Sequence, residues 1–347
     1  MFGGGPERSL ARLDLKLGIP RKRPLWARGL GAFIEFPAVY CDGMLYVNND
    51  DGETFAIQAA TGKVRWRRLG DAPKPSSPAI AGDLVIVTSK NGKVDAFDRK
   101  TGRIVWELRM SSNVESSPAA LGGLVFFGAN DGRLFAADSQ TGQVRWAFDT
   151  GGRINSSPTI VADRVCITTY AGSIFCLRRA DGGLVWRTFV KRDAFRYESF
   201  YASASSDGER LFTTARSGKV VALSAETGRV EWTQRVGGLG YPTPAVGADR
   251  IFVGGFDGIM RAFRSTDGTE IWRTKIGGRI LGAPFVAGNL VFVATLETRT
   301  FAVRASDGQV MWSLNIGKYS PGIATERAYY LSLNGILAAF PGTLGPD

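Results

Sequence analysis

Short apolar runs separated by turn residues recur along the chain. The stretch from Ser76 reads SSPAIAGDLVIVTSKNGKVDAFDRKTGRIVW, and the stretch from Ser116 reads SSPAALGGLVFFGANDGRLFAADSQTGQVRW. Each contains three runs rich in Val, Ile, Leu and Phe, and then a fourth run that carries a tryptophan. Gly, Asn and Asp separate the runs, which predicts short β-strands joined by tight turns such as Asn91-Gly92. No window keeps apolar residues at helical spacing, so helix should be nearly absent.

The tryptophan of the fourth run marks a fixed period. Successive tryptophans are 40 residues apart, except for one step of 46 residues between Trp186 and Trp232. A period of this length is typical of repeat architectures, and four short strands per repeat are typical of a β-propeller blade. We expect the tryptophans to be structural residues that dock one blade against the next. They are Trp26, Trp66, Trp106, Trp146, Trp186, Trp232, Trp272 and Trp312.

The two ends of the chain complement each other. After Trp312 three more strands are predicted, from about Tyr319 to Phe340, without another tryptophan, whereas Trp26 lacks the three strands that should precede it. Pairing these segments would complete a blade and leave no open sheet edge. The sequence therefore predicts an all-β, eight-bladed β-propeller of four-stranded antiparallel blades, with the ring closed by the N- and C-terminal segments. We assign residues 1–20 to a flexible basic linker, 21–341 to the propeller and 342–347 to a C-terminal tail.

The string AxDxxTGxxxW occurs at Ala96–Trp106 and again at Ala136–Trp146. It resembles the tryptophan-docking repeat of the PQQ-like eight-bladed propellers, a superfamily that includes quinoprotein alcohol dehydrogenases and outer-membrane assembly lipoproteins of the BamB type. The resemblance covers nearly the whole chain, but several repeats have lost the aspartate of the string. The position of Asp98 is occupied in other repeats by Gln58, Arg178, Ser224, Arg264 and Arg304. The resemblance implies the fold, which hosts several unrelated functions.

Composition and hydropathy place the chain among globular proteins. Of its 347 residues, 44% are apolar and 22% are charged, so it can bury a large core. It contains no apolar run long enough to span a membrane, and its first 23 residues are too polar and basic for a secretory signal. Relatives of the fold often work in the cell envelope, so the resemblance implies an envelope or extracellular location if an N-terminal anchor was trimmed. Otherwise we expect a cytoplasmic location. In either case we expect a monomer.

The net charge of +11 comes mainly from arginine and favours anionic partners. However, the longest basic run is Arg21-Lys22-Arg23, and no nucleic-acid-binding motif is present. We therefore expect a solvated, arginine-rich surface with a protein or small anion as partner, and not nucleic acid.

Histidine is absent, and cysteine is rare. The first absence excludes Ser-His-Asp triads, histidine-based zinc sites and CxxCH haem attachment. Cys41, Cys166 and Cys176 have no metal-binding spacing, so no metal site is expected. Cys166 and Cys176 flank a predicted turn and could face each other across a hairpin; we expect two reduced thiols, although an oxidising compartment would favour a disulfide.

In a propeller, the innermost strands line a central channel, and the loops that lead into them converge on one mouth. Candidate ligand-binding residues were chosen by their register after each tryptophan, and from the insertion within Lys191–Ser203 that interrupts the repeat. They are Glu35, Glu115, Arg153, Asn155, Arg196, Tyr197, Glu198, Tyr201, Tyr241, Arg279, Lys318 and Tyr319. We expect Arg153, Arg196 and Arg279 to make the mouth electropositive. Because guanidinium groups bind carboxylates and phosphates through bidentate hydrogen bonds, such a mouth would bind an anionic ligand.

Two functions are compatible with this pattern. The first is a non-catalytic scaffold or sensor that binds a protein or an anionic ligand at the channel mouth, without a cofactor. The second, implied by the resemblance, is a quinoprotein dehydrogenase that holds PQQ and calcium there with Glu, Asn and Asp side chains, for which Glu115 and Asn155 are of the right type. The short, regular repeats lack the long loops that wall in the quinone in those enzymes, and this favours the scaffold.

Overall fold

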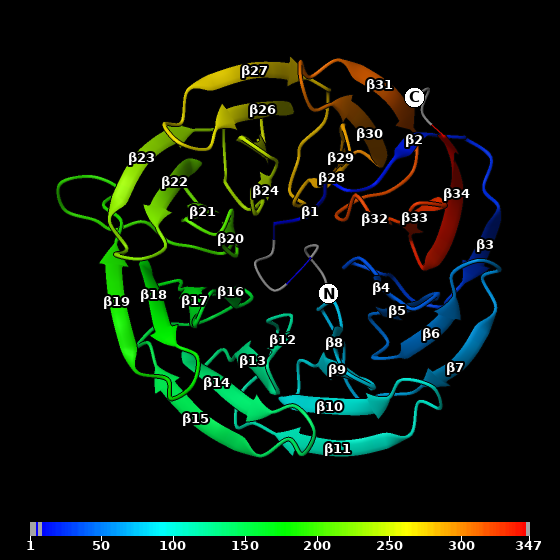
Figure 1. Ribbon diagram of the computed structural model, residues 1–347, viewed down its shortest axis with the longest axis horizontal. Helices are drawn as coiled ribbons and strands as arrows, with labels where there is room; N and C mark the ends of the chain where they lie inside the picture. The colour runs from blue at the N-terminus through cyan, green and yellow to red at the C-terminus, as the bar shows by residue number, and fades with distance from the viewer. Residues whose placement is uncertain (1–4, 6–8, 345–347) are drawn as a thin grey trace.

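The computed structural model describes residue 5 and residues 9–344, and that part of the chain contains strands and turns but no helix. Eight antiparallel sheets stand around a central channel like the blades of a propeller (Figure 1). In seven blades, four consecutive strands follow one another in chain order from the channel to the rim. The eight-bladed, all-β architecture predicted from the tryptophan period is therefore confirmed.

The strands of these seven blades have the following bounds. The first four blades are β4 (Val39–Cys41), β5 (Met44–Asn48), β6 (Thr54–Gln58) and β7 (Val64–Arg68); β8 (Ala79–Ala81), β9 (Leu84–Thr88), β10 (Lys93–Asp98) and β11 (Ile104–Arg109); β12 (Ala119–Leu121), β13 (Leu124–Gly128), β14 (Arg133–Asp138) and β15 (Val144–Asp149); and β16 (Thr159–Val161), β17 (Arg164–Thr168), β18 (Ser173–Arg178) and β19 (Leu184–Phe189). The next three are β20 (Ser205–Ser206), β21 (Arg210–Thr214), β22 (Lys219–Ser224) and β23 (Val230–Arg235); β24 (Ala245–Val246), β25 (Arg250–Gly254), β26 (Ile259–Arg264) and β27 (Glu270–Lys275); and β28 (Phe285–Ala287), β29 (Leu290–Thr295), β30 (Arg299–Arg304) and β31 (Val310–Leu314).

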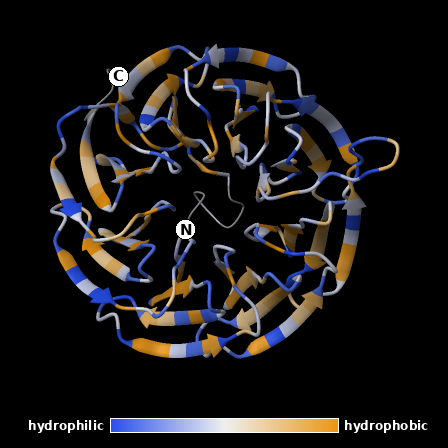
Figure 2. Cartoon of the chain, turned by 180° about the vertical axis from the view of Figure 1, so that it is seen from behind, coloured by the Kyte–Doolittle hydropathy of each residue, from blue (hydrophilic) through white to orange (hydrophobic). Residues whose placement is uncertain are grey.

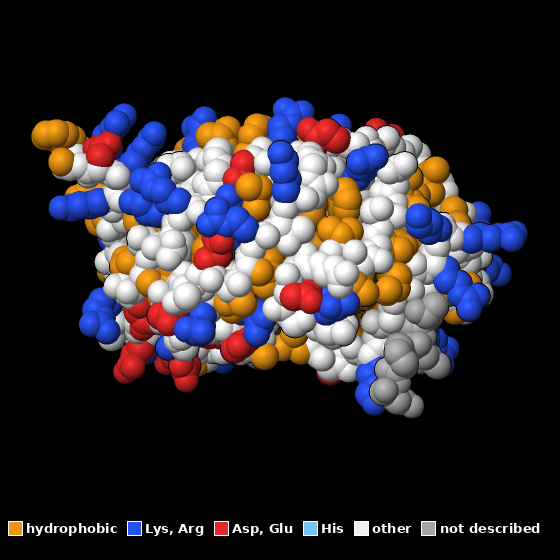
Figure 3. All heavy atoms as spheres, turned by 90° about the horizontal axis from the view of Figure 1, so that it is seen from above, with side chains coloured by type: hydrophobic (Ala, Val, Ile, Leu, Met, Phe, Trp, Pro, Cys, Tyr) orange, Lys and Arg blue, Asp and Glu red, His pale blue; other side chains and the backbone are white. Residues whose placement is uncertain are grey.

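The core lies between neighbouring blades. The middle strand β10 buries four consecutive residues because blades pack against both of its faces, whereas the rim strand β11 is largely exposed apart from Trp106. Figure 2 shows the same contrast, with mostly hydrophobic inner strands and mixed rim strands. Seen edge-on, the molecule is a thick disc from which one segment protrudes (Figure 3). In the described residues, no helix has the length and hydropathy of a membrane span.

The eighth blade is shared between the termini. It consists of β32 (Ile323–Ala324), β33 (Ala328–Leu333) and β34 (Ile336–Leu344) from the C-terminal end, and its rim is formed by N-terminal strands. β3 (Trp26–Gly29) pairs with the first half of β34, from Trp26↔Ala339 to Gly29↔Ile336. β2 (Leu17–Pro20) pairs with the second half. The predicted closure is confirmed, and it uses two N-terminal strands where one was expected.

The segment expected to be a flexible basic linker is mostly structured. Residues 1–4 and 6–8 lie outside the described residues, but β1 (Ala11–Arg12) pairs in parallel with β28, and Leu10, Leu15 and Leu17 are buried. The linker prediction is therefore wrong for residues 9–20, because these leucines pack into the cores of the last two blades. The expected tail also begins later, since β34 extends to residue 344; residues 345–347 lie outside the described residues.

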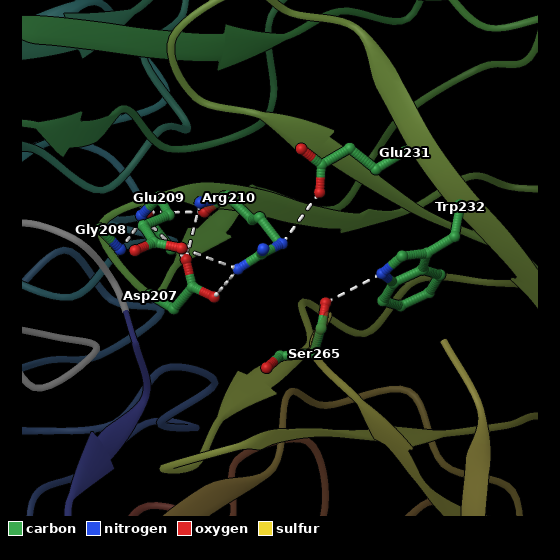
Figure 4. A network of polar contacts seen from close by, with 8 residues as sticks. Asp207, Gly208, Glu209, Arg210, Glu231, Trp232 and Ser265 are labelled. Atoms are coloured by element: carbon green, nitrogen blue, oxygen red, sulfur yellow. Dashed lines mark hydrogen bonds and ion pairs between the residues drawn. The ribbon is translucent and has the colours of Figure 1, made fainter. Parts of the chain in front are cut away.

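The tryptophans dock each blade onto the next through a hydrogen bond and a glycine contact. Trp232 Nε1 donates to the Ser265 carbonyl at 2.9 Å (Figure 4). Gly268 has a φ of +75°, and a Cβ there would lie 2.6 Å from the Trp232 ring, which explains the recurrent glycine. Seven tryptophans donate in this way. Trp312 Nε1 has no acceptor among the described residues, because β34 continues as a strand where the other blades turn.

Cys166 and Cys176 form a disulfide. They lie directly opposite each other on β17 and β18, with their Cα atoms 4.1 Å apart. The expectation of two reduced thiols is therefore wrong, because antiparallel pairing of the two strands brings the thiols together. Cys41 is not in a disulfide.

Lys74 and Asp95 occupy positions that several other repeats fill with apolar side chains. The corresponding residues are Ile34, Val114, Ile154 and Ile280 for Lys74, and Phe55, Phe135, Phe175 and Phe301 for Asp95. Only 3% of Lys74 and 7% of Asp95 is exposed. Lys74 Nζ donates to Thr54 Oγ1 at 3.0 Å, while Asp95 Oδ1 has no partner among the described residues. Burial lowers the pKa of Lys74 to about 8, against the opposing attraction of Asp95.

We expect the double substitution Lys74→Ile and Asp95→Phe to raise the free energy of unfolding by about 1–4 kcal/mol, because it replaces buried charges with the apolar pair of the other repeats. Between pH 8 and the usual lysine pKa of 10.5, the unfolded chain holds a proton that the folded Lys74 has lost. Stability of the parent should therefore rise with pH across this window, and the variant should lose that rise. Urea denaturation across this range measures both effects; a less stable double variant would contradict the prediction.

Candidate functional site

The channel contains a cavity of about 620 Å³ at the end where the loops between blades converge. Each of these loops joins the rim strand of one blade to the inner strand of the next, so it must cross the same face of the disc (Figure 1). One residue from each loop lines the cavity, nine positions after each tryptophan once the six-residue insertion before Tyr201 is skipped. This mouth ring is Glu35, Pro75, Glu115, Asn155, Tyr201, Tyr241, Leu281 and Pro321.

A belt of serine hydroxyls holds part of this ring in place. The backbone N–H of Ser77 donates to Ser117 Oγ at 3.1 Å, that of Ser117 to Ser157 Oγ at 2.9 Å, and that of Ser157 to Ser203 Oγ at 2.8 Å. Each serine follows a mouth-ring residue by two positions. The belt therefore ties neighbouring inner strands together and sets the spacing of Pro75, Glu115, Asn155 and Tyr201.

The polar side of the cavity is organised around Glu115. Its Oε1 accepts a hydrogen bond from Asn130 Nδ2 at 3.0 Å, and its Oε2 accepts one from Asn155 Nδ2 at 3.1 Å. Arg153 Nη2 lies 3.6 Å from Oε1 and completes an ion pair. Asn155 Oδ1 is buried without a partner among the described residues. The Glu115 carboxylate is thus held by three side chains, and a neighbouring amide oxygen stays free to accept.

Glu35 is the second carboxylate of the cavity, and it has no hydrogen bond or ion pair within the described residues. Burial raises its pKa, and the carboxylates of Asp50 and Glu115 raise it further, while Lys90 opposes them. The polar side therefore holds negative charge that is only partly compensated. A cation or a hydrogen-bond donor suits this side of the cavity better than an anion does.

Three tyrosines form an aromatic wall of the cavity. Tyr201 packs edge-to-face against Tyr170, with ring centroids 6.3 Å apart, and against Tyr241 at 5.4 Å. Phe256 and Tyr319 line the same cavity. Burial raises the pKa of Tyr201, and the carboxylates of Glu115 and Glu35 raise it further. The mouth is therefore divided into a carboxylate and amide side and an aromatic side.

The insertion does not reach the mouth. It projects outward from the ring between β19 and β23 (Figure 1). Arg196 pairs with Asp193 at 2.8 Å, and the Tyr197 ring packs on Phe189 with centroids 5.0 Å apart. Glu198 is 2% exposed, accepts a hydrogen bond from Ser217 Oγ and pairs with Lys219. The prediction that Arg196, Tyr197 and Glu198 line the channel is therefore wrong, because these contacts hold the insertion against β19 and the β21–β22 turn, away from the cavity.

The predicted cluster of arginines does not form either. Arg153 pairs with Glu115, and Arg279 pairs with Glu297 at 2.8 Å while it lies over the Phe256 ring. Lys318 lies over the Tyr319 ring at 5.3 Å. The expectation that these three arginines make the mouth electropositive is wrong, since each has a carboxylate partner and Arg196 lies on the insertion.

The Glu115 carboxylate, which the resemblance offered as a calcium ligand, is already engaged by neighbouring side chains. Both carboxylate oxygens of Glu115 accept amide hydrogens, and the Arg153 guanidinium lies beside them, where it would repel a divalent cation. Among residue 5 and residues 9–344, no group of three or more His, Cys, Asp or Glu side chains is arranged to hold a metal ion.

Two groups of residues that line the cavity were not among the candidates chosen by their position after each tryptophan. Lys90, Tyr170 and Phe256 lie in turns between the second and third strands of their blades and line the cavity. All three stand 24 residues after a tryptophan, so the same repeat contained the signal. Leu10 and Arg12, from the supposed linker, line the cavity as well because β1 pairs with the inner strand β28.

Comparison with known proteins agrees with this architecture. BamB from Moraxella catarrhalis superposes with a TM-score of 0.78 at 18% identity, over 92% of this chain and 99% of that one. A quinohemoprotein alcohol dehydrogenase from Comamonas testosteroni superposes with a TM-score of 0.81 at 14% identity, over 100% of this chain and 80% of that one. The computationally designed Ika8 protein superposes with a TM-score of 0.80 at 14% identity, over 93% of this chain and 100% of that one. At sequence identities this low, the superpositions show only that the fold is shared.

No curated protein matches the chain. The family model described as outer membrane protein assembly factor BamB matches residues 19–194 and 171–326. Since these two matches together span most of the chain, the protein belongs to the family of the outer membrane protein assembly factor BamB.

Proposed function

We propose that the protein is a non-catalytic binding platform that holds a segment of a partner protein in the cavity at the channel mouth. The observation that carries the proposal is the division of this 620 Å³ cavity into a carboxylate and amide side and a tyrosine wall. An extended peptide presents side chains on alternating sides, so polar or basic side chains can meet Glu35 and Glu115 while apolar ones meet Tyr201 and Tyr241.

The cavity's polar groups support binding over catalysis. Glu115 is fully engaged by its neighbours, and the serine hydroxyls of the belt accept backbone hydrogen bonds from adjacent blades. Groups held in this way present a preformed surface for binding. The family name, an assembly factor of the outer membrane, favours a protein partner and the cell envelope as the place of action.

Photo-crosslinking in the native cells tests the proposal. A benzoylphenylalanine in place of Tyr201 should form a covalent adduct with one polypeptide, whereas the same group in place of the exposed Val105 on the rim strand β11 should not. Adding Tyr241→Asp should abolish the adduct, because it places a charge in the aromatic wall. Equal adducts from both positions would refute the cavity as the binding site.

A second measurement separates the enzyme alternative. Native mass spectrometry with added calcium and PQQ should show no stoichiometric complex. A one-to-one complex together with alcohol-dependent dye reduction would instead establish a quinoprotein dehydrogenase.

A further inference from the structure

One part of the mouth-side face carries cations without carboxylate partners. Six lysine and arginine side chains there are exposed and form no ion pair within the described residues. This group, here called the basic arc, is Lys191, Arg192, Arg216, Arg235, Lys275 and Arg299. It extends from the insertion across the blades β20–β23, β24–β27 and β28–β31.

Backbone contacts place the basic arc on one face of the disc. The N–H of Arg216 donates to the carbonyl of Ser199 at 2.8 Å, so its turn touches the loop that leads to the mouth. Arg235 lies opposite Lys219 at the end of β22 next to that turn, and Lys275 lies opposite Ile259 at the same end of β26. Arg299 begins β30 directly after the corresponding turn. All of these positions are at the ends of the blades that face the mouth.

The carboxylates in these mouth-side loops and turns already have partners, so they do not neutralise the arc. The four ion pairs are Arg196–Asp193, Lys219–Glu198, Arg261–Asp257 and Arg279–Glu297. Elsewhere on the molecule, some cations contact several carboxylates. On the opposite face, for example, Arg210 alone contacts Asp207, Glu209 and Glu231 (Figure 4). The six cations of the basic arc are therefore exposed without a carboxylate partner in the described residues.

The insertion presents an apolar tip beside the arc. Phe195 is 96% exposed. Its N–H donates to Asp193 Oδ1 at 3.0 Å, and the N–H of Arg192 donates to the Arg196 carbonyl at 2.9 Å, so the tip is a hydrogen-bonded hairpin. Leu239, in the next mouth-side loop, is 41% exposed. Figure 3 shows the protruding segment at the upper left, with a hydrophobic end flanked by Lys and Arg side chains.

We propose that this face docks on an anionic phospholipid surface, with the basic arc against the headgroup phosphates and Phe195 in the interfacial layer. Lysine and arginine side chains near an anionic bilayer each add to its affinity, and guanidinium groups suit phosphate oxygens. The cations are spread over a broad rim, which matches a flat surface better than a single polymer strand. A polyanion without an apolar layer would leave Phe195 in water, whereas a bilayer interface receives it. This inference does not depend on the cavity.

The experiment is sedimentation with vesicles at physiological salt. The parent protein should bind phosphatidylcholine vesicles that contain about a quarter phosphatidylglycerol and should not bind pure phosphatidylcholine. Replacing Arg216, Arg235, Lys275 and Arg299 with glutamine in a single variant should weaken binding about a thousandfold.

The matched control removes the same charge from the opposite face. Its substitutions are Lys63→Gln, Lys100→Gln, Arg103→Gln and Arg229→Gln, all at exposed turn positions. This variant should bind anionic vesicles within about threefold of the parent. Both variants should have the same melting temperature as the parent, since the replaced side chains are exposed. Equal loss in both variants would assign binding to net charge and refute the docking face, and so would retained binding in the arc variant.

Two further outcomes would overturn the inference. One is the absence of binding to the anionic vesicles. The other is tighter binding of poly-glutamate or of a DNA duplex than of the vesicles at the same salt, which would point to an acidic protein or a nucleic acid. Replacing Phe195 with serine should weaken vesicle binding severalfold and leave binding of poly-glutamate unchanged, and an unchanged vesicle affinity would contradict insertion of the tip.

Discussion

Replacing Trp106 with alanine is expected to lower the free energy of unfolding by about 3–5 kcal/mol. The indole is 8% exposed and lies between two blades, where its Nε1 donates to the Ser139 carbonyl at 3.1 Å. Alanine would leave a cavity at this interface and an unpaired carbonyl. Denaturant titration followed by circular dichroism measures the loss. A variant that unfolds like the parent would show that these residues do not dock the blades.

Phenylalanine substitutions separate the hydrogen bond from the packing. Trp106→Phe keeps most of the ring but leaves the Ser139 carbonyl without its donor, which should cost about 1–3 kcal/mol. Trp312→Phe should cost less than Trp106→Phe, because Trp312 Nε1 has no acceptor among the described residues. Equal losses at the two positions would mean that the indole hydrogen bonds contribute nothing measurable.

Deleting residues 1–30 is expected to remove more than about 5 kcal/mol of stability, comparable to the whole stability of many domains. The deletion removes β2 and β3, so β34 loses its partners on the rim side along its whole length. It also removes β1 from β28 and takes Leu10, Leu15 and Leu17 from the cores of the last two blades. An opened ring exposes a long sheet edge, which favours aggregation. Size-exclusion chromatography with light scattering and hydrogen exchange at β34 report the effect.

A shorter deletion provides the comparison. Removing residues 1–21 takes away β1 and β2 but keeps β3, so the ring stays closed at one half of β34. We expect this variant to remain monomeric and to be less stable than the parent. If both deletions melt like the parent, ring closure by the N-terminal strands does not contribute to stability.

Much of the fold follows from the sequence because a propeller repeat relates distant positions by a constant offset. Once the tryptophan period is known, the number of blades, the order of strands and the mouth register follow without any knowledge of packing. The register correctly placed Glu35, Glu115, Asn155, Tyr201 and Tyr241 in one cavity. The terminal fragments predicted the closing blade for the same reason, since each lacked what the other supplied.

The tertiary structure alone decided where the irregular parts go. The insertion has no equivalent in the other repeats, and its direction depends on the contact of Glu198 with Ser217 and Lys219 on a neighbouring blade. The N-terminal segment is ordered by β28 and β34, hundreds of residues away, so its local sequence reads as a linker. The charge of the mouth was misjudged because Arg153 and Arg279 meet carboxylates contributed by other loops. A repeat fixes backbone positions, whereas pairing between side chains depends on which segments the closed ring brings into contact.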